Sequence, residues 1–363
     1  MQCDDHAGAI RSSRSTPAAI RAYPSRFAGA LVALLALCAA AAARAQDVAS
    51  FYRGRTISLL MGTGPGGSYE FYGRTIAAHL GRHSPGAPHI VVEYMPGAGG
   101  ALAGNHLFGP APQDGSKLLL SHALPLIEKM EAGAGIRYES AKLQWLGAYD
   151  EIVQVLAMWH NPPVPAVGDL ARPDLVLGAM GRTHLSYQWA TLVKDTIGAS
   201  YRIVPGYTTG GALNLAMERG EINGWVIAWE GIIGGQQHWL RDKQISIPVQ
   251  FALERMPALP DTPTLLEIAR PEMRDIIEFL LAGTPIARAM AVGPGVPRDR
   301  VAALRKAFAD MLRDPAFLDE AKRRNLSIRY RNPDETLALV EKITKASPEL
   351  VARVKKAVGA PDE

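Results

Sequence analysis

The chain has 363 residues and carries 39 lysines and arginines against 35 aspartates and glutamates, a formal net charge of +4. So small an excess of positive charge gives no basis for a nucleic-acid partner, while the length allows two domains of ordinary size. Cys3 and Cys38 are the only cysteines, which excludes disulfide and thiol chemistry beyond residue 38.

The first 45 residues have the order of a secretory signal peptide. Four arginines lie in the polar stretch 1–26, an uncharged run covers residues 27–43, and Ala43-Arg44-Ala45 is a small-x-small cleavage signature. We expect cleavage after Ala45 and export to the periplasm. Cleavage would remove five arginines and two aspartates, which lowers the net charge from +4 to +1. The alternative is an uncleaved membrane anchor, although the run is at the short edge of the about 17–25 residues that span a bilayer.

The next segment combines a strand, a glycine turn and a helix. Residues 57–61 form a short apolar run that ends at a glycine, which predicts a buried strand. Residues 62–67 are too rich in glycine for a helix or strand interior. Ser68 is a suitable helix N-cap, and apolar residues then recur every fourth position from Tyr72 to Leu80. This arrangement presents unpaired backbone N–H groups and is typical of anion binding.

The same order of strand, turn and helix recurs further along. Further strands are predicted over residues 89–94, 117–121, 175–179, 201–205, 222–229 and 244–252, with helices over residues 101–108, 185–197 and 212–219. Strands that alternate with helices indicate parallel sheets, whose ligands bind beyond the carboxyl ends of the strands. Both early glycine turns and His122, which follows the third strand, belong to such an edge. Trp225 and Trp229 fall on one face of a predicted strand and are expected in the core.

Two α/β units with a cleft between them are predicted from this repetition. The long β-like run over residues 144–159 is broken by the proline-rich stretch 161–165, which we interpret as the crossover into the second unit. We expect a first lobe of residues 46–150 plus 253–363 and a second lobe of residues 151–252. The amphipathic helices from residue 298 onward are expected to pack on the first lobe.

A second function also fits the first turn. Gly62, Gly64 and Gly67 satisfy the G-x-G-x-x-G dinucleotide fingerprint, and Glu93 stands where an acidic ribose ligand is expected. The alternative is therefore a dinucleotide-dependent oxidoreductase. Export, Pro65 inside the turn and the repeated Pro-Gly turns favour a binding protein instead.

Catalytic and metal motifs give no positive evidence. No G-x-S-x-G, H-E-x-x-H or P-loop lysine motif occurs, so we predict neither an enzyme nor a cofactor. His79 and His83 have the i, i+4 spacing of a metal pair on a helix, but no third ligand is evident. We therefore expect a solvated helix end and no metal site.

Short motifs follow one another over nearly the whole chain beyond the leader. They are Pro65-Gly-Gly-Ser-Tyr-Glu70, Pro96-Gly-Ala-Gly-Gly100, Ala111-Pro-Gln-Asp-Gly115, Val204-Pro-Gly-Tyr207, Glu218-Arg-Gly-Glu-Ile-Asn-Gly224, Leu259-Pro-Asp-Thr-Pro-Thr264, Gly293-Pro-Gly-Val-Pro297 and Asp314-Pro-Ala-Phe317. In this order they resemble the substrate-binding receptors of tripartite tricarboxylate transporters, the Bug or TctC-like family. The resemblance implies a type II periplasmic binding fold, in which each of two lobes has a mixed, mostly parallel sheet flanked by helices. It further implies a monomer that closes on a small organic acid and delivers it to the membrane subunits of a transporter.

The resemblance also implies where the ligand lies. Backbone N–H groups of the first-lobe turns hold its carboxylate, at Gly66, Gly67, Ser68, Tyr69, Glu70, Gly97, Ala98, Gly99 and Gly100. The second lobe seals the other end through Gly181, Arg182, Thr183, His184, Tyr207, Thr208, Thr209 and Gly210. His122 is a further candidate contact, with a satisfied histidine at a strand end as its alternative. The family commonly has aspartate at the position of Glu70, so the size class of the ligand stays open.

Overall fold

The computed structural model describes residues 48–65, 67–121, 124–131, 135–181, 184–207 and 209–359. The predicted signal peptide lies outside these ranges, as do five candidate site residues: Gly66, His122, Arg182, Thr183 and Thr208. Within the described ranges, every helix is too short or too polar to cross a bilayer.

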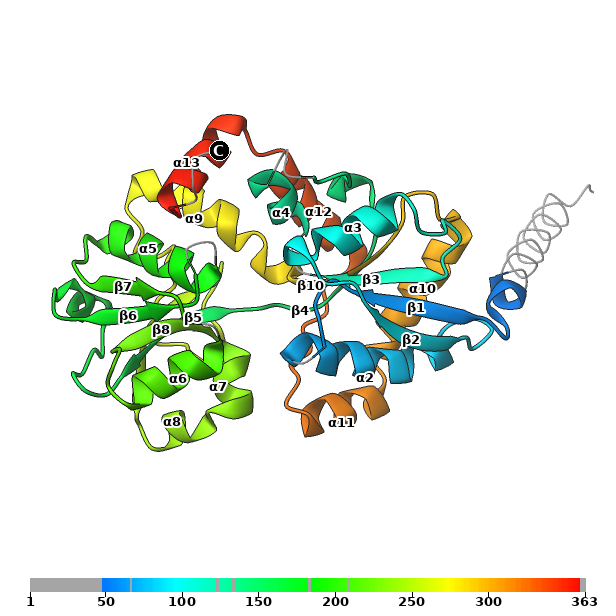
Figure 1. Cartoon of the computed structure of the whole chain (residues 1–363). Coiled ribbons are helices and arrows are strands. Elements are labelled where there is room, and N and C mark those ends of the chain that lie inside the picture. The colour runs from blue at the N-terminus through cyan, green and yellow to red at the C-terminus, as the bar shows by residue number, and fades with distance from the viewer. Residues whose placement is uncertain are drawn as a thin grey trace, which may run out of the picture. The chain divides into compact units, whose positions relative to one another are not determined.

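The first of two sheets contains five strands in the order β2-β1-β3-β10-β4 (Figure 1). The strands are β1 (Thr56–Met61), β2 (His89–Tyr94), β3 (Lys117–Ser121), β4 (Gln144–Asp150) and β10 (Arg288–Val292). β1 pairs in parallel with β2 and β3, while β10 runs antiparallel between β3 and β4. The sheet is therefore mixed, with one late strand inserted among early ones.

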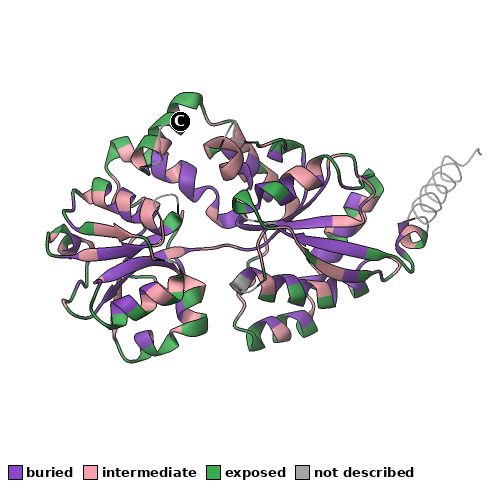
Figure 2. Cartoon of the chain, viewed as in Figure 1, coloured by how far each residue is buried: buried purple, intermediate pink, exposed green. Residues whose placement is uncertain are grey.

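Helices cover both faces of this sheet, because its strands are apolar on both sides (Figure 2). In β1, Ile57 and Leu59 pack towards α2 (Gly67–His83) and α10 (Arg298–Met311), whereas Leu60 packs towards α3 (Ala101–Phe108). The remaining helices around this sheet are α4 (Leu124–Met130), α11 (Pro315–Arg323) and α12 (Pro333–Thr344). α11 packs on α2, and α12 packs on β4 and α4.

The second sheet has five strands in the order β7-β6-β8-β5-β9. They are β5 (Gln154–Trp159), β6 (Val176–Ala179), β7 (Arg202–Pro205), β8 (Gly224–Ala228) and β9 (Ile245–Phe251). β6 is parallel to β7 and β8, and β5 is antiparallel to β8 and β9. Its helices include α5 (Leu185–Ile197), α6 (Gly210–Glu218), α7 (Trp229–Gly235) and α8 (Gln237–Arg241). The predicted α/β class with two mixed, helix-flanked sheets is confirmed.

The change from one sheet to the other occurs earlier than predicted. β4 ends at Asp150 in the first sheet and β5 begins at Gln154 in the second, so residues 151–153 make the crossover. The expectation of a crossover at residues 161–165 was wrong, because those prolines only follow the end of β5. Residues 151–153 contain no glycine or proline, and the strands on either side are apolar. In the sequence, residues 144–159 therefore have the pattern of a single strand.

Two local predictions, one for tryptophan and one for serine, were wrong in part. Trp225 is a buried strand residue, but Trp229 is the first residue of α7 and lies partly exposed. β8 therefore stops at Ala228. α2 begins at Gly67, which places Ser68 inside the first turn rather than at the N-cap.

The C-terminal segment is divided between two sets of neighbours. α10 packs on α2 and β4. The last helix, α13 (Pro348–Ala357), instead contacts α4, α5 and α9 (Arg274–Leu281), of which α5 belongs to the second sheet. Contacts of the tail are thus not confined to the helices of the first sheet.

Candidate ligand-binding site

The glycine turns lie at the carboxyl edge of the first sheet. Met61, the last residue of β1, is in register with Tyr94 at the end of β2 and with Leu120 near the end of β3. The helices that follow β1 and β2 therefore begin at one edge. The first N–H groups of α2 have no acceptor within the helix, so they are candidate donors to an anion. At the start of α3, the N–H groups of Ala101 and Leu102 instead donate to Ala98 and Gly97 of the preceding turn.

At the first turn, backbone groups rather than side chains are the candidates for binding an anion. Gly67, Ser68 and Tyr69 supply the first N–H groups of α2. The hydroxyl of Tyr69 donates to the carbonyl oxygen of Ala287, and burial raises the pKa of Tyr69, which keeps this donor protonated. The Tyr69 hydroxyl is thus engaged within the protein, and the backbone N–H of Tyr69 remains the candidate contact.

Glu70 has its charge balanced nearby. Its Oε1 atom lies 2.6 Å from Nε of Arg74 and accepts from the hydroxyl of Tyr94 at 2.8 Å. An ionised Glu70 beside a ligand carboxylate would otherwise repel it. The Arg74 guanidinium reduces that repulsion, so Glu70 is compatible with an anion at the first turn.

Thr63 is a candidate contact that the sequence reasoning missed. Its Oγ1 atom is buried within the glycine turn and has no hydrogen-bond partner in the described part of the chain. A buried hydroxyl without a partner costs about 1–3 kcal/mol. A hydroxyl among turn glycines was the signal that could have revealed it.

The second turn has an unusual backbone. Gly97, Ala98, Gly99 and Gly100 have φ values of 147°, 44°, 64° and 104°, and Ala98–Gly100 form the short 3₁₀ helix η1 before α3. Within the turn, the N–H of Gly100 donates to the carbonyl oxygen of Gly97 at 2.9 Å, so Gly97, Ala98 and Gly99 are the candidate anion donors. Apart from Gly100, the turn is exposed. Glycine is favoured at position 99 because the backbone there has a φ of 64°, which side chains with a Cβ rarely adopt.

Two further helices begin at the carboxyl edge of the second sheet. Thr209 is the N-cap of α6, where its Oγ1 accepts from the N–H of Ala212 at 3.1 Å. Gly210 lies inside α6, and a Cβ there would approach the Trp225 ring at 3.2 Å, so this glycine serves packing. Tyr207 packs its ring against the core and donates its backbone N–H to Ala179. The Tyr207 hydroxyl is therefore its candidate contact.

His184 caps α5, and the backbone N–H of His184 itself is occupied by Gly181. Its Nδ1 accepts from the N–H of Ser186 at 3.1 Å. Partial burial lowers the pKa of His184, so the ring is neutral at neutral pH. With Nδ1 as acceptor, the proton lies on Nε2. His184 can therefore donate one hydrogen bond without carrying a charge.

A buried ionic cluster lies beside these turns and was not predicted. Arg288 opens β10 opposite Asp150, the last residue of β4. Its Nη1 is 2.8 Å from Oδ2 of Asp150 and 2.9 Å from Oε1 of Glu230 in the first turn of α7. The hydroxyl of Tyr72 lies 2.7 Å from the same Asp150 oxygen. Arg288 and Asp150 are each 1% exposed, so this cluster is closed to solvent.

The electrostatics of the cluster follow from its burial. Burial raises the pKa of Asp150 to about 6, although the Arg288 guanidinium acts in the opposite direction. Burial also raises the pKa of Glu230. One guanidinium faces two carboxylates, so the second carboxylate lacks a matching cation. Sequence reasoning missed the cluster because it missed β10.

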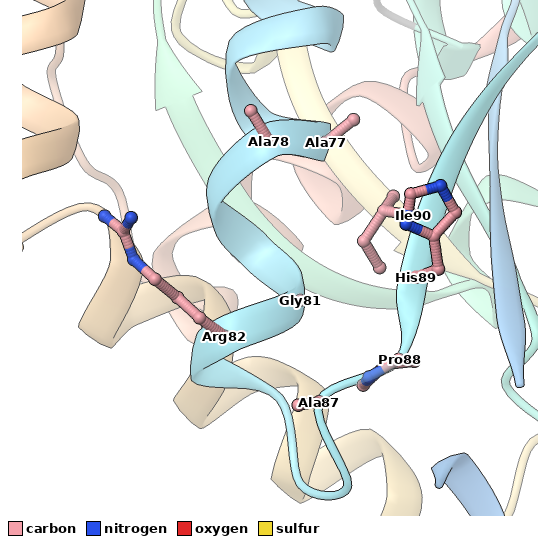
Figure 3. A pocket seen from close by; sticks show the side chains of 8 residues that line it. All are labelled: Ala77, Ala78, Gly81, Arg82, Ala87, Pro88, His89 and Ile90. Carbon is pink, nitrogen blue, oxygen red and sulfur yellow. The ribbon is translucent and has the colours of Figure 1, made fainter. Parts of the chain in front are cut away.

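A shallow pocket elsewhere is not this site. It lies between α2 and the start of β2, at the opposite edge of the sheet from the turns (Figure 3). Its lining is mostly small and apolar: Ala77, Ala78, Gly81, Arg82, Ala87, Pro88, His89 and Ile90. We assign no ligand to it.

The histidine pair on α2 has structural partners. His79 is buried against α11, where its Nε2 lies 2.7 Å from Glu320, and His83 lies 2.9 Å from Asp314. The expectation of a solvated helix end was wrong for His79, because α11 covers it. Across the described residues, no three histidines, cysteines or acidic residues are grouped as metal ligands.

The structure disfavours the dinucleotide-binding alternative, because Glu93, its expected ribose ligand, already has partners. The carboxylate of Glu93 accepts from Ser58 at 2.6 Å and forms an ion pair with Lys117 at 3.0 Å. These contacts lower the pKa of Glu93, with the Ser58 hydrogen bond as the largest cause. Glu93 is therefore engaged within the sheet rather than presented to a ribose.

Comparison with known proteins identifies the fold. Neither a protein-family model nor a curated protein sequence matches the chain. A ligand-free TctC solute-binding protein from Polaromonas is similar with a TM-score of 0.65 and 17% identity, over 85% of this chain and 100% of that one. The periplasmic binding protein BugD gives 0.59 and 19%, over 84% and 98%. MatC from Rhodopseudomonas palustris, with bound malate, gives 0.57 and 20%, over 84% and 99%.

A protein from R. palustris with bound adipate is similar to the same extent, with a TM-score of 0.59 and 19% identity over 84% of this chain and 98% of that one. Identities below 25% establish the fold rather than the ligand. The resemblance inferred from the motifs is confirmed at this level. The chain has the fold of the TctC and Bug periplasmic binding proteins.

Proposed function

We propose that the protein is an extracytoplasmic solute-binding receptor that captures a small carboxylate between two lobes. The observation that carries this proposal is the carboxyl edge of the first sheet, where the first turn of α2 and the exposed, positive-φ residues Gly97–Gly99 both lie. A helix N-terminus carries about half a positive charge. The malate- and adipate-bound structures with the same fold support a carboxylate as the ligand.

The site residues are proposed as two sets. The first holds the carboxylate through backbone N–H groups of residues 66–70 and 97–100, with Thr63 added. The second is formed by residues 181–184 and 207–210, with His122 as a further contact. The lobes proposed for this function are residues 46–150 with 253–363, and residues 151–252. Strand membership of the two sheets supports that division.

The cellular role proposed is delivery of the ligand to a membrane transporter, by a periplasmic monomer whose leader is cleaved after Ala45. No enzymatic step is part of this proposal. The fold of the TctC and Bug proteins and the basic, apolar and small-residue order of the leader support it.

A thermal-shift titration tests the proposal directly. Purified protein is heated with malate, adipate, a panel of other mono-, di- and tricarboxylates, and NAD as the control for the alternative. A true ligand at one hundred times its Kd should stabilise the fold by about 2.7 kcal/mol. Stabilisation by NAD alone would reject the receptor. Native mass spectrometry of the same preparation identifies any ligand retained through purification.

A further inference from the structure

Two chain segments connect the sheets, and they lie against each other. Residues 151–153 lead from β4 to β5, and residues 252–287 lead from β9 back to β10. The N–H of Ile152 donates to the carbonyl oxygen of Thr284 at 3.3 Å, and the N–H of Trp229 donates to Val153 at 2.9 Å. The start of α7 is thus tied to the crossover itself.

Arg288 stands where these segments meet. It is paired with Asp150 within the first sheet, because β10 begins at Arg288 and β4 ends at Asp150 at the same edge. Its second carboxylate partner, Glu230, comes from α7, which follows β8 of the second sheet. One buried guanidinium therefore joins elements of both sheets. The other oxygen of Glu230, Oε2, is buried with no hydrogen-bond partner in the described part of the chain, so the Arg288 contact dominates how this carboxylate is held.

The proposed anion-binding turn is connected to the same point. Tyr69, in the first turn of α2, donates to the carbonyl of Ala287, the residue before Arg288. Tyr72, one turn later, lies 2.7 Å from Asp150, and its ring centroid is 4.3 Å from the Arg288 guanidinium carbon. The N-terminal part of α2 is therefore fastened to the crossover by two tyrosines.

We propose that the Arg288–Glu230 ion pair sets the angle between the two sheets, and that Tyr69 links this hinge to the anion-binding turn of α2. Arg288 acts as a positioning residue and does not touch the ligand. The link to the turn rests on the proposed function, whereas the hinge role of the ion pair does not. Hinges are often a few residues at element ends that absorb a rotation, and residues 151–153 and 287–288 occupy such ends.

The charges of the cluster indicate which substitution removes the Arg288–Glu230 ion pair without unfolding the protein. Removing Arg288 would leave Asp150 and Glu230 buried without a cation, which is strongly destabilising. Glu230→Ala instead leaves the one-to-one pair of Arg288 with Asp150 intact, so the fold should persist. Glu230→Gln keeps an oxygen that can accept from Arg288 and removes only the charge.

The test measures the distance between spin labels at Asp319→Cys on α11 and Gln237→Cys on α8, both at exposed positions. It uses the full chain with Cys3→Ser and Cys38→Ser. Without ligand, we expect Glu230→Ala to shift or broaden the distance distribution, and Glu230→Gln to do so less. Glu341→Ala is the matched control, because its ion pair joins α12 only to Lys345, the C-cap residue of the same helix.

An unchanged distribution in Glu230→Ala would overturn the hinge role. The link to the turn is tested with malate and adipate at saturating concentration: in Tyr69→Phe, the distance change that the ligand produces in the wild type should be lost, whatever affinity calorimetry gives for the variant. A distance change equal to that of the wild type would reject the link. Absence of binding of any tested carboxylate to the wild type would count against the proposed function, and the ligand-free measurement would still decide the hinge.

Discussion

At the scale of single residues, the candidate site divides its work between backbone and side chains. The anion donors that we propose are backbone N–H groups, while the side chains of Tyr69 and Glu70 are engaged with Ala287 and Arg74. Glycine and proline spacing predicts the backbone part, because turn geometry is local. The side-chain partners could not be predicted, since Ala287 is 218 residues from Tyr69 along the chain.

If backbone groups hold the carboxylate, substitutions in the two turns should differ in their effect on binding. Gly99→Val should abolish carboxylate binding, because valine rarely adopts a φ near 64° and its Cβ would press on Ile127. Ser68→Ala removes at most one neutral hydrogen bond, so it should cost about 0.5–1.5 kcal/mol of binding. Calorimetry compares the two, with thermal melts to confirm folding. Normal binding by Gly99→Val, together with loss of binding on changes at residues 181–184, would place the carboxylate on the second sheet.

The buried carboxylate of Asp150 predicts a pH dependence of stability. Its pKa is raised from 3.8 to about 6, so the folded state binds a proton more tightly than the unfolded chain does. The contribution of this group is fully present below about pH 4 and is lost as the pH rises through about 6. The unfolding free energy of the wild type, relative to Asp150→Asn, should therefore fall between about pH 4 and about pH 7.

Chemical denaturation at a series of pH values measures this difference. Glu230, whose pKa burial also raises, shares Arg288 with Asp150, so the same comparison is repeated with Glu230→Gln in both proteins. A relative stability that rises with pH would mean that attraction to Arg288 outweighs burial at Asp150.

At the scale of elements, local signals located most of the early chain. β1, β2, β3, α3 and α5 occupy the predicted residues, because each has an apolar pattern and a glycine, proline or polar boundary. β10 was missed, since its five residues include a buried arginine and follow a 3₁₀ turn rather than a glycine. The cluster that Arg288 organises was lost with it. A charged residue inside an apolar run has meaning only when its partners are known.

Helix α12 offers a test of capping. Asn332 accepts from the N–H of Glu335 at 2.9 Å, and the Glu335 side chain accepts from the N–H of Asn332 at 3.1 Å. Asn332→Ala removes the first of these bonds and should lower the unfolding free energy by about 1 kcal/mol. Asn332→Asp keeps the acceptor and serves as the control. Equal stability of the alanine variant and the wild type would show that packing on β4 alone maintains α12.

At the scale of the whole molecule, the predicted leader gives a testable expectation of where the protein acts. We expect the N-terminus of protein recovered from the periplasm to be Gln46 or to lie within a few residues of it, because Ala43-Arg44-Ala45 is the cleavage signature. N-terminal sequencing and intact-mass measurement check this. An intact segment 1–45 on functional protein would instead support an uncleaved anchor.

The position of β10 also determines when the molecule can be completed. β4 joins the first sheet only through β10, which lies between it and β3. The second sheet is formed by the contiguous residues 154–251, so all its strands are available well before Arg288 is synthesised. Until then β3 and β4 each expose an unpaired edge, the kind of surface on which chains aggregate. While the chain folds, the first sheet is therefore more open to aggregation than the second until residues 288–292 are in place.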